Sequence, residues 1–403
     1  MKYVNISVIE AGVALRFSYT PSSLRHWRGN SKRSRFHSLH HTQFRTNYSL
    51  FMPFYDYMYN TMDKSSDELY EKSLKVTDET PDLVHLTHMT TLQSTYHLRI
   101  GIASIASKPS DNPIWYSWMI WPVACLSMVL AWVYGLSAFV IERLQMKKFK
   151  MQTWAIPRYN FQYGMTWERE STNNLIEKAI LDADERGVKV LSLGLLNQAK
   201  TLNRSGELFI QKYPKLRVRL VDGSGLATAV VLQSIPFGTK KVFLSRITSK
   251  VAQGTAIGLC EIGIQVIMNQ KKEHDMLQSR LPEGRTIYLK FSNKDIPQIW
   301  IGDNIDDKQQ QRAPKGTTFI PTSQFPLKKI RKDCTYLSTP AMKIPETMKN
   351  VHTCENWLPR RVTSAWRVAG ILHALEGWDM HECGDDKTWS AAIKHGFAPL
   401  TKY

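Results

Sequence analysis

An uncharged, apolar stretch from Ile114 to Ile141 dominates the hydrophobic pattern of the chain. A helix needs about 20 apolar residues to cross the hydrocarbon layer of a membrane, and tryptophans gather at the start of this stretch as they do at a membrane interface. Basic residues are more frequent after it than before it, which places the following part of the chain in the cytosol. The pattern predicts a transmembrane or re-entrant segment over residues 113–142. Pro122 and Gly135 leave the re-entrant form open, and a buried core helix is the alternative.

Beyond this stretch, short apolar runs alternate with amphipathic ones. Residues 170–187 have the period of a helix that ends at a glycine, and the run VKVLSLGLL that follows is typical of a buried strand. Short apolar strands that alternate with helices indicate a parallel sheet with helices on both faces. We therefore predict an α/β fold with a doubly wound, Rossmann-like domain over residues 165–403. Its further predicted helices are 224–235, 249–263 and 363–376, and its strands are 188–196, 216–223, 240–245, 264–268, 286–291, 298–303 and 317–321.

The composition adds a size and a charge. At 403 residues, and roughly 150 residues per domain, two or three domains are expected. The 53 Lys and Arg against 35 Asp and Glu give a net charge of +18, which suits an acidic partner, either nucleic acid or an anionic membrane. No nucleic-acid-binding motif accompanies the basic runs of residues 11–55 and 308–332. We therefore favour a membrane surface and expect no nucleic-acid partner, with a solvated basic surface as the alternative. The five cysteines follow no CxxC spacing and are expected to be thiols in a reducing compartment.

Three histidines lie close together in FHSLHHTQF. On a helix, the spacing of His37, His40 and His41 places their imidazoles on one face, where neutral ring nitrogens bind transition metals. His85 and His88, in VHLTH, are weaker candidates for the same site. A polar loop rich in histidine is the alternative for the first group, and a structural role is favoured for His85 and His88 taken singly.

Longer motifs carry a family resemblance. Five segments of the chain closely resemble segments of the plant eceriferum and glossy proteins, the very-long-chain aldehyde decarbonylases of cuticular wax synthesis. These segments are HSLHHTQFRTNYSLFMPFYDYMYNTMDKSSDELYEKSL, VLSLGLLNQ, VDGSGLATAVVLQSIP, APKGTTFIP and VHTCENWLPRRVTSAWRVAGILHALEGWDMHECGD. The resemblance runs from about Phe36 to Leu400. It implies an endoplasmic-reticulum membrane protein of the fatty acid hydroxylase superfamily, with a Rossmann-like C-terminal domain in the cytosol. The implied reaction converts a very-long-chain fatty aldehyde to an alkane one carbon shorter at a histidine-ligated di-iron centre, with NADPH as the indirect electron source.

The resemblance also assigns residues and partners. His37, His40 and His41 match the family's last histidine box, whereas the two preceding boxes have no counterpart, because His26 is the only histidine before His37. Residues 36–110 are therefore expected to be a membrane-helical remnant of the hydroxylase domain, and we hypothesise that the atypical residues 1–35 are a gene-model artefact. The expected function is an aldehyde decarbonylase in an alkane-synthesis complex, and the alternative is a non-catalytic scaffold or regulatory subunit of that complex. The implied partners are a sister eceriferum-type subunit, cytochrome b5, a second copy of the chain, membrane lipid and the long-chain aldehyde.

The C-terminal half contains a degenerate dinucleotide turn. KKVFLSRITSKVAQG has the contour of the TGxxxxxG turn of short-chain reductases, with Ser245 and Arg246 in the Thr-Gly places and Gly254 as the remaining glycine. Ser245 and Gly254 are therefore weak candidates for cofactor binding. A fold retained without a cofactor is favoured, because a side chain at residue 246 obstructs the close approach of the backbone to a dinucleotide. Among the candidate functions of the chain, a reductase that binds NADPH here ranks third, after the decarbonylase and the non-catalytic subunit. The VDGSGL turn at 221–226 is a second weak phosphate cradle, with simple helix capping as the alternative.

Soft metal ligands gather near the C-terminus. His352, Cys354, His373, His381 and Cys383 suit zinc by type, but their spacing matches no standard zinc finger. The tryptophans around them favour a packed helix pair instead.

Overall fold

The structure is a computed structural model of the 403-residue chain. His37, His40 and His41 lie outside the described residues, as does most of the predicted membrane segment. Within the described part of the chain, no helix is both long enough and apolar enough to cross a membrane. The structure describes residues 59–61, 80–89, 135–145, 149–292, 296–303, 305–327, 330–348, 357–359, 361–382 and 385–400, and single residues at 122, 125, 126, 129, 132 and 355.

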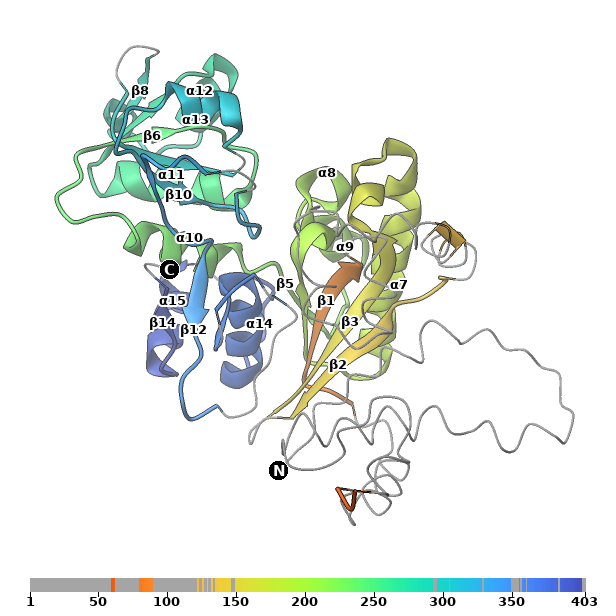
Figure 1. Cartoon of the computed structure of the whole chain (residues 1–403). Coiled ribbons are helices and arrows are strands. Elements are labelled where there is room, and N and C mark those ends of the chain that lie inside the picture. The colour runs from red at the N-terminus through yellow and green to blue at the C-terminus, as the bar shows by residue number, and fades with distance from the viewer. Residues whose placement is uncertain are drawn as a thin grey trace, which may run out of the picture.

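The first of two α/β lobes (Figure 1) is built on a five-stranded sheet in the order β2-β3-β1-β4-β5. Strands β3, β1, β4 and β5 are parallel, and β2 is an antiparallel edge strand beside β3. Helix α7 covers one face of this sheet with a stripe of buried residues at helical spacing, from Leu175 to Ala183. The strands are Leu83–Met89 (β1), Phe139–Gln145 (β2), Lys150–Tyr159 (β3), Val190–Leu193 (β4) and Arg219–Val221 (β5). The helices are Arg169–Glu185 (α7), Lys200–Asn203 (α8) and Glu207–Lys212 (α9), with 3-10 turns at Asn160–Gly164 (η2), Thr166–Glu168 (η3) and Leu195–Gln198 (η4).

The second lobe is built on a six-stranded parallel sheet in the order β11-β10-β9-β6-β7-β8. Counted from β6, this is the 3-2-1-4-5-6 order of dinucleotide-binding folds. The strands are Lys241–Leu244 (β6), Gln265–Met268 (β7), Leu289–Phe291 (β8), Ile299–Gly302 (β9), Thr318–Pro321 (β10) and Thr335–Tyr336 (β11). The helices are Lys250–Glu261 (α11), Lys271–Gln278 (α12) and Asp307–Arg312 (α13), with a 3-10 turn at Thr286–Tyr288 (η5).

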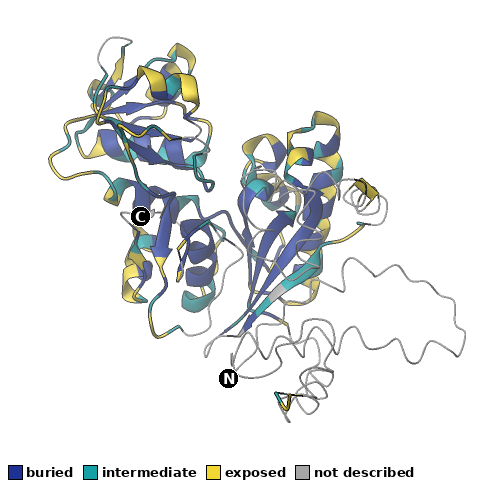
Figure 2. Ribbon diagram, viewed as in Figure 1, coloured by how far each residue is buried: buried dark blue, intermediate teal, exposed yellow. Residues whose placement is uncertain are grey.

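The two lobes share one buried cluster, to which several helices contribute, α15 among them. Helices α10, α11 and α14 contribute to a buried cluster that also contains residues of both large sheets, and Figure 2 shows that the strands of both sheets are mostly buried. Strand β6 shows the period of two that this arrangement requires. Val242 and Leu244 face the shared cluster, whereas Phe243 faces a separate cluster with Trp300 and Phe319. The joining elements are Ser224–Gln233 (α10), Ala365–Glu376 (α14) and Asp385–Lys394 (α15), with a small antiparallel sheet of Val362–Ser364 (β13), Ala341–Lys343 (β12) and Ala398–Pro399 (β14).

The predicted α/β alternation is confirmed, since each strand and helix predicted after residue 165 has a counterpart in the structure. Strands β1, β2 and β3 are not among the predictions. Strand β1 lies within residues 36–110 and occupies the middle of the first sheet, and β2 begins at Phe139, inside the predicted membrane segment. The α/β architecture therefore includes residues that precede 165. The run LVHLTHM conceals its strand character because both faces of β1 are buried, so its polar residues do not alternate with apolar ones.

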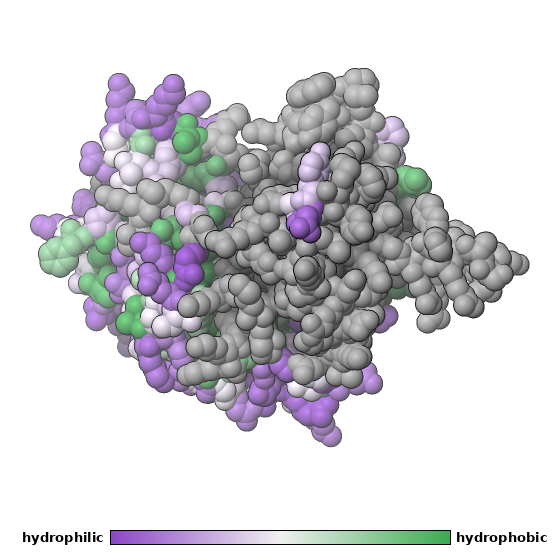
Figure 3. Space-filling view, turned by 60° about the horizontal axis from the view of Figure 1, so that its bottom comes forward, coloured by the Kyte–Doolittle hydropathy of each residue, from purple (hydrophilic) through white to green (hydrophobic). Residues whose placement is uncertain are grey.

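On the described part of the face drawn in Figure 3, hydrophobic residues are scattered among hydrophilic ones.

Candidate functional site

Asp303, directly after β9, closes the turn that opens α11. Its carboxylate accepts hydrogen bonds from the backbone N–H groups of Thr248 and Ser249 at 3.2 and 2.8 Å. It also accepts hydrogen bonds from the hydroxyl groups of Thr248, Ser249 and Thr322, each at 2.5 Å. Ser249 is the N-cap residue and accepts the Ala252 N–H at 3.1 Å. A carboxylate of the protein thus lies at the helix N-terminus where dinucleotide folds hold a phosphate.

Two more N–H groups of this turn are bound within the protein. Ser245 donates to the Ile301 carbonyl at 2.9 Å, and Ile247 donates to the Glu273 carboxylate at 2.8 Å. Arg246 carries its side chain where the reductase motif has a glycine. A bound dinucleotide needs free N–H groups and a close backbone approach for its diphosphate. The residues of this turn therefore do not fit the diphosphate of NADPH.

Gly254 has a packing position in the structure, away from Ser245. It lies on α11 where that helix crosses α10, and a Cβ atom added to it would lie 3.0 Å from Thr228 Oγ1. Thr228 is itself buried. The glycine permits the close approach of α10 and α11, and the two residues predicted to bind a cofactor do not form one site.

The VDGSGL turn before α10 is occupied by Glu382. Its Oε2 atom accepts the backbone N–H groups of Asp222 and Gly223 at 2.7 and 2.9 Å, and the N–H of Gly225 also bonds this carboxylate. Burial, together with the negative charge of Asp222, raises the pKa of Glu382 well above its usual range. Lys250 donates to Asp222 at 2.9 Å. Gly223, not Asp222 or Ser224, is the N-cap residue of α10, and the Asp222 carboxylate accepts the Ser224 N–H at 2.8 Å. The N–H groups that a phosphate would need in this turn are therefore bound to carboxylates of the protein.

The described histidines of the C-terminal segment have structural partners. His381 Nδ1 accepts the Leu220 N–H at 3.0 Å, which ties the segment to strand β5. His373 is buried against Trp378, with ring centroids 4.8 Å apart, and burial lowers the pKa of His373 to about 4. The other candidates, His352, Cys354 and Cys383, lie outside the described residues. Among the residues that can be described, no three His, Cys, Asp or Glu side chains come together as metal ligands would.

His85 and His88 lie on strand β1, in the middle of the first sheet. His85 Nδ1 lies 3.2 Å from Ser192 Oγ, and burial lowers the pKa of His85 well below its usual value. Burial lowers the pKa of His88 to about 3, and its Nδ1 atom has no hydrogen-bond partner. Both imidazoles are therefore neutral at physiological pH, and the described part of the chain places no further ligands beside them for an iron ion.

A pocket of about 330 Å³ lies at the carboxyl ends of β6, β7 and β9. We call it the switch-point pocket, because β6 and β9 are the neighbours from which the strand order runs in opposite directions. In open α/β sheets this is the general position of ligand sites. The pocket is lined by Phe243, Ser245, Arg246, Asn269, Gln270, Trp300, Asp306, Lys308, Gln309 and Arg312.

The sequence contains signals for some of these features. Arg246 stands out as a substituted glycine, and Lys308 and Arg312 belong to a basic run without acids. Asp303 ends a predicted strand, which is a common position for a polar residue at the edge of a parallel sheet. No local pattern connects Glu382 with the turn at Asp222, because the two residues are 160 positions apart.

Comparison with known proteins agrees with this architecture. Residues 242–399 match the family model described as the CER1-like C-terminal domain. The chain is 76% identical over 375 residues to the very-long-chain aldehyde decarbonylase GL1-7 of Oryza sativa subsp. japonica, a match that covers 91% of this chain and 59% of that protein. It is 74% identical over 372 residues to GL1-4 of Oryza sativa subsp. indica and 52% identical over 376 residues to CER1 of Arabidopsis thaliana, covering in each case 91% of this chain and 60% of the relative.

The chain thus spans about three fifths of the length of these curated relatives. Among solved structures, a D-lactate dehydrogenase from Treponema pallidum matches 38% of this chain and 53% of its own at 10% identity and a TM-score of 0.20, which supports no argument. The identity to the curated relatives extends over nearly the whole chain, and the resemblance noted in the sequence is confirmed. Residues 242–399, which include nearly all of the second lobe, match the CER1-like C-terminal domain, and 91% of the chain is similar to about three fifths of its CER1 and GL1 relatives.

Proposed function

We propose that the chain acts in the conversion of very-long-chain fatty aldehydes to alkanes for cuticular wax. The observation that carries this proposal is the 76% identity to a protein named a very-long-chain aldehyde decarbonylase. The chain covers 59% of that relative, so the activity of the whole relative comes to this chain as a proposal.

The proposed reaction requires a metal that activates oxygen. We propose His37, His40 and His41 as the iron ligands. Their side chains lie outside the described residues, and among the described residues no further metal ligands gather beside the buried histidines of β1. A ferrous centre would supply oxygen activation, with electrons that derive from NADPH through cytochrome b5. The β6–α11 turn does not contribute to that supply directly, because its N–H groups are bound to Asp303 and Glu273.

We place the protein at the endoplasmic-reticulum membrane, with the second, Rossmann-like lobe in the cytosol. Exposed apolar side chains beside α7 support a membrane surface. Trp132, from the predicted membrane segment, stacks on Trp167 with ring centroids 5.2 Å apart, and Leu136 and Trp167 are 68% and 60% exposed. An open hollow of about 570 Å³ lies between these residues and α7. Apolar groups of this size at the surface favour contact with lipid or with a partner protein.

A second function, a non-catalytic subunit of the alkane-forming complex, is favoured by one observation. The sequence contains one histidine box where the family resemblance implies three. In this role the Rossmann-like lobe would bind a complete sister subunit or a second copy of the chain.

Expression in yeast beside an aldehyde-forming partner separates the two functions. We expect alkanes from the full chain, iron that co-purifies with it, and loss of both in the triple variant His37→Ala, His40→Ala, His41→Ala. His26→Ala is the matched control, since it removes an imidazole from the same region but outside the HxxHH pattern. Absence of alkane and iron, together with co-purification of a complete relative, would support the subunit function and contradict the enzyme.

A further inference from the structure

The switch-point pocket has an excess of positive charge that the protein does not neutralise. Arg246, Lys308 and Arg312 line it, and Asp306 is the acidic residue of the lining, so three cations face one acid and the balance is 3 − 1 = +2. In the described part of the chain none of the three cations forms an ion pair. The Asp306 carboxylate is engaged as the cap of α13, where it accepts the Gln309 N–H at 2.8 Å.

Two other cations of the same lobe are paired with neighbouring carboxylates, unlike the three cations of the pocket. Arg331 pairs with Asp333 at 2.6 Å, and Lys271 pairs with Asp275 at 3.1 Å. Cations from the end of β6 and from α13 that line one pocket, without an ion pair among the described residues, indicate a site for an anion.

Ser245 supplies a second, independent observation. Its side chain is 2% exposed and lines the pocket, and its hydroxyl group has no hydrogen-bond partner in the protein. A buried hydroxyl without a partner costs free energy. An acceptor oxygen of a ligand in the pocket would satisfy it.

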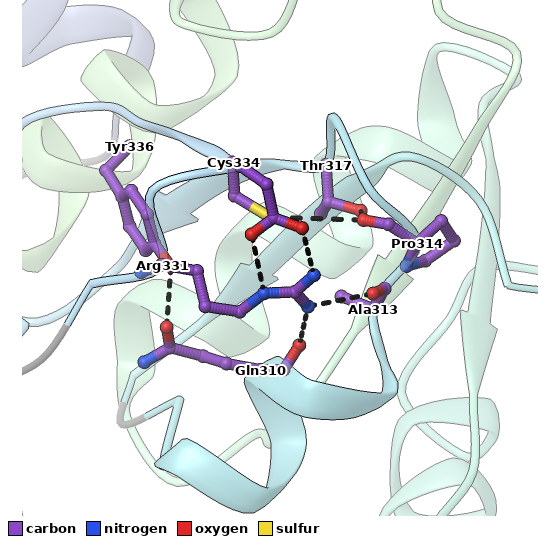
Figure 4. Close-up of polar contacts among 8 residues, drawn as sticks. Gln310, Ala313, Pro314, Thr317, Arg331, Cys334 and Tyr336 are labelled. Carbon is purple, nitrogen blue, oxygen red and sulfur yellow. Dashed lines mark hydrogen bonds and ion pairs between the residues drawn. The ribbon is translucent and has the colours of Figure 1, made fainter.

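Helix α13 is held in place, so its two cations are positioned before a ligand arrives. The Arg331 guanidinium donates to the carbonyl groups of Gln310 and Ala313 at the end of the helix. Its distance to the Ala313 carbonyl oxygen is 2.9 Å. The Tyr336 hydroxyl donates to the Gln310 side chain at 2.5 Å, and Figure 4 shows these groups gathered around the Arg331 side chain. A fixed helix lowers the entropic cost of ordering Lys308 and Arg312 around an anion.

The chemistry of these groups favours phosphate. A guanidinium matches two phosphate oxygens with a planar pair of donors, and a lysine ammonium adds a point charge. The backbone N–H groups of Ile247, Thr248 and Ser249 are already bound to Glu273 and Asp303, so we assign the anion to side chains. A volume of about 330 Å³ is at the small end of ligand pockets, which suits a small phosphate ester better than a dinucleotide.

We propose that the switch-point pocket binds the phosphate group of a small phosphate ester through Arg246, Lys308, Arg312 and the Ser245 hydroxyl. The proposed phosphate site uses none of the histidines proposed to hold iron, and it does not depend on the proposed alkane chemistry.

The proposal is tested by calorimetric titration of the full chain with glycerol 3-phosphate and with inorganic phosphate. A lipid as the source of the phosphate is tested by flotation of the chain with phosphatidylcholine vesicles that contain phosphatidic acid. We expect saturable binding of a soluble probe, weakened roughly tenfold to a hundredfold by Arg246→Gln or Arg312→Gln. Ser245→Ala should weaken binding roughly tenfold without lowering thermal stability, because the hydroxyl has no partner to lose.

Arg285→Gln is the charge-matched control, because Arg285 is exposed on the same lobe and does not line the pocket. Binding of vesicles alone, lost in Arg246→Gln and retained in Arg285→Gln, would support the same site with a lipid phosphate. The proposal is overturned if none of the three probes binds, or if Arg285→Gln weakens binding as much as Arg246→Gln does.

Discussion

The turns that open α10 and α11 are both closed by a carboxylate of the protein, but the two carboxylates differ in origin and in completeness. Asp303 comes from the next strand of the same sheet and accepts hydrogen bonds from two backbone N–H groups and three hydroxyl groups. Glu382 comes from the C-terminal segment. Its Oε2 atom accepts backbone N–H groups, whereas its Oε1 atom is buried without a partner.

The difference shows two ways in which a carboxylate of the protein can take the place that a phosphate would occupy before a helix. At α11 the replacement is local and fully hydrogen-bonded, so it belongs to the stability of the second lobe. At α10 the replacement fastens a distant segment to the end of β5, and the negative charge of Asp222 beside it leaves the carboxyl with a raised pKa. The contribution of the Glu382 cap to stability is therefore expected to depend on pH.

Removal of Asp303 is expected to have the largest effect. Asp303→Ala leaves the N–H and hydroxyl donors at the start of α11 without their acceptor and should lower the free energy of unfolding by about 3–4 kcal/mol. Glu382→Ala should cost about 1 kcal/mol, because it also removes a poorly solvated carboxyl group. Urea unfolding of the full chain, followed by tryptophan fluorescence, measures both. An equal or larger loss in Glu382→Ala would contradict the distinction between a complete and an incomplete cap.

The crossing of α10 and α11, which joins the two turns, gives a second test. Gly254→Ala should lower the free energy of unfolding by about 1–2 kcal/mol, because the added Cβ atom would lie 3.0 Å from Thr228 Oγ1. In a Thr228→Ala background the same change should stabilise the protein by up to about 1 kcal/mol, since alanine is the better helix former. Denaturant titrations of the four proteins of this cycle measure the coupling. An equal cost of Gly254→Ala in both backgrounds would show that contact with the Thr228 side chain is not the cause of that cost.

The parts of the fold that repeat a local pattern could be predicted from the sequence. Helix α11 and strands β6 and β7 lie within a residue or two of their predicted bounds, because short apolar runs and capped helices carry their signal within a few residues. Strand β1 could not be found in this way, because its histidines and threonine are buried among apolar residues and its partners β3 and β4 follow much later in the chain.

The candidate site shows the same limit. The sequence locates the β6–α11 turn and identifies Arg246 as an obstruction, but it does not show that Asp303 occupies the helix terminus or that α13 brings Lys308 and Arg312 to the same pocket. These juxtapositions depend on the strand order of the sheet. The predicted iron ligands His37, His40 and His41 stay a prediction, because they lie outside the described residues.

The smallest expected effect separates the two caps by pH. The pKa of Glu382 is raised in the folded protein by burial and by Asp222, so the folded state holds this proton more tightly than the unfolded state does. Its contribution to stability is therefore complete below the unfolded pKa and is lost as the pH rises through the raised folded pKa, with a slope of at most about 1.4 kcal/mol per pH unit. Glu382→Gln should remove this slope and should be at least as stable as the wild type at neutral pH.

Glu376→Gln is the matched control, because hydrogen bonds from Lys394 and His395 lower the pKa of Glu376, and its contribution is lost as the pH falls instead. Urea midpoints measured from pH 4 to pH 8 give the slopes. If Glu382→Gln keeps the wild-type pH dependence, the pKa of Glu382 is not raised in the folded protein. The completeness of hydrogen bonding alone would then distinguish the two caps.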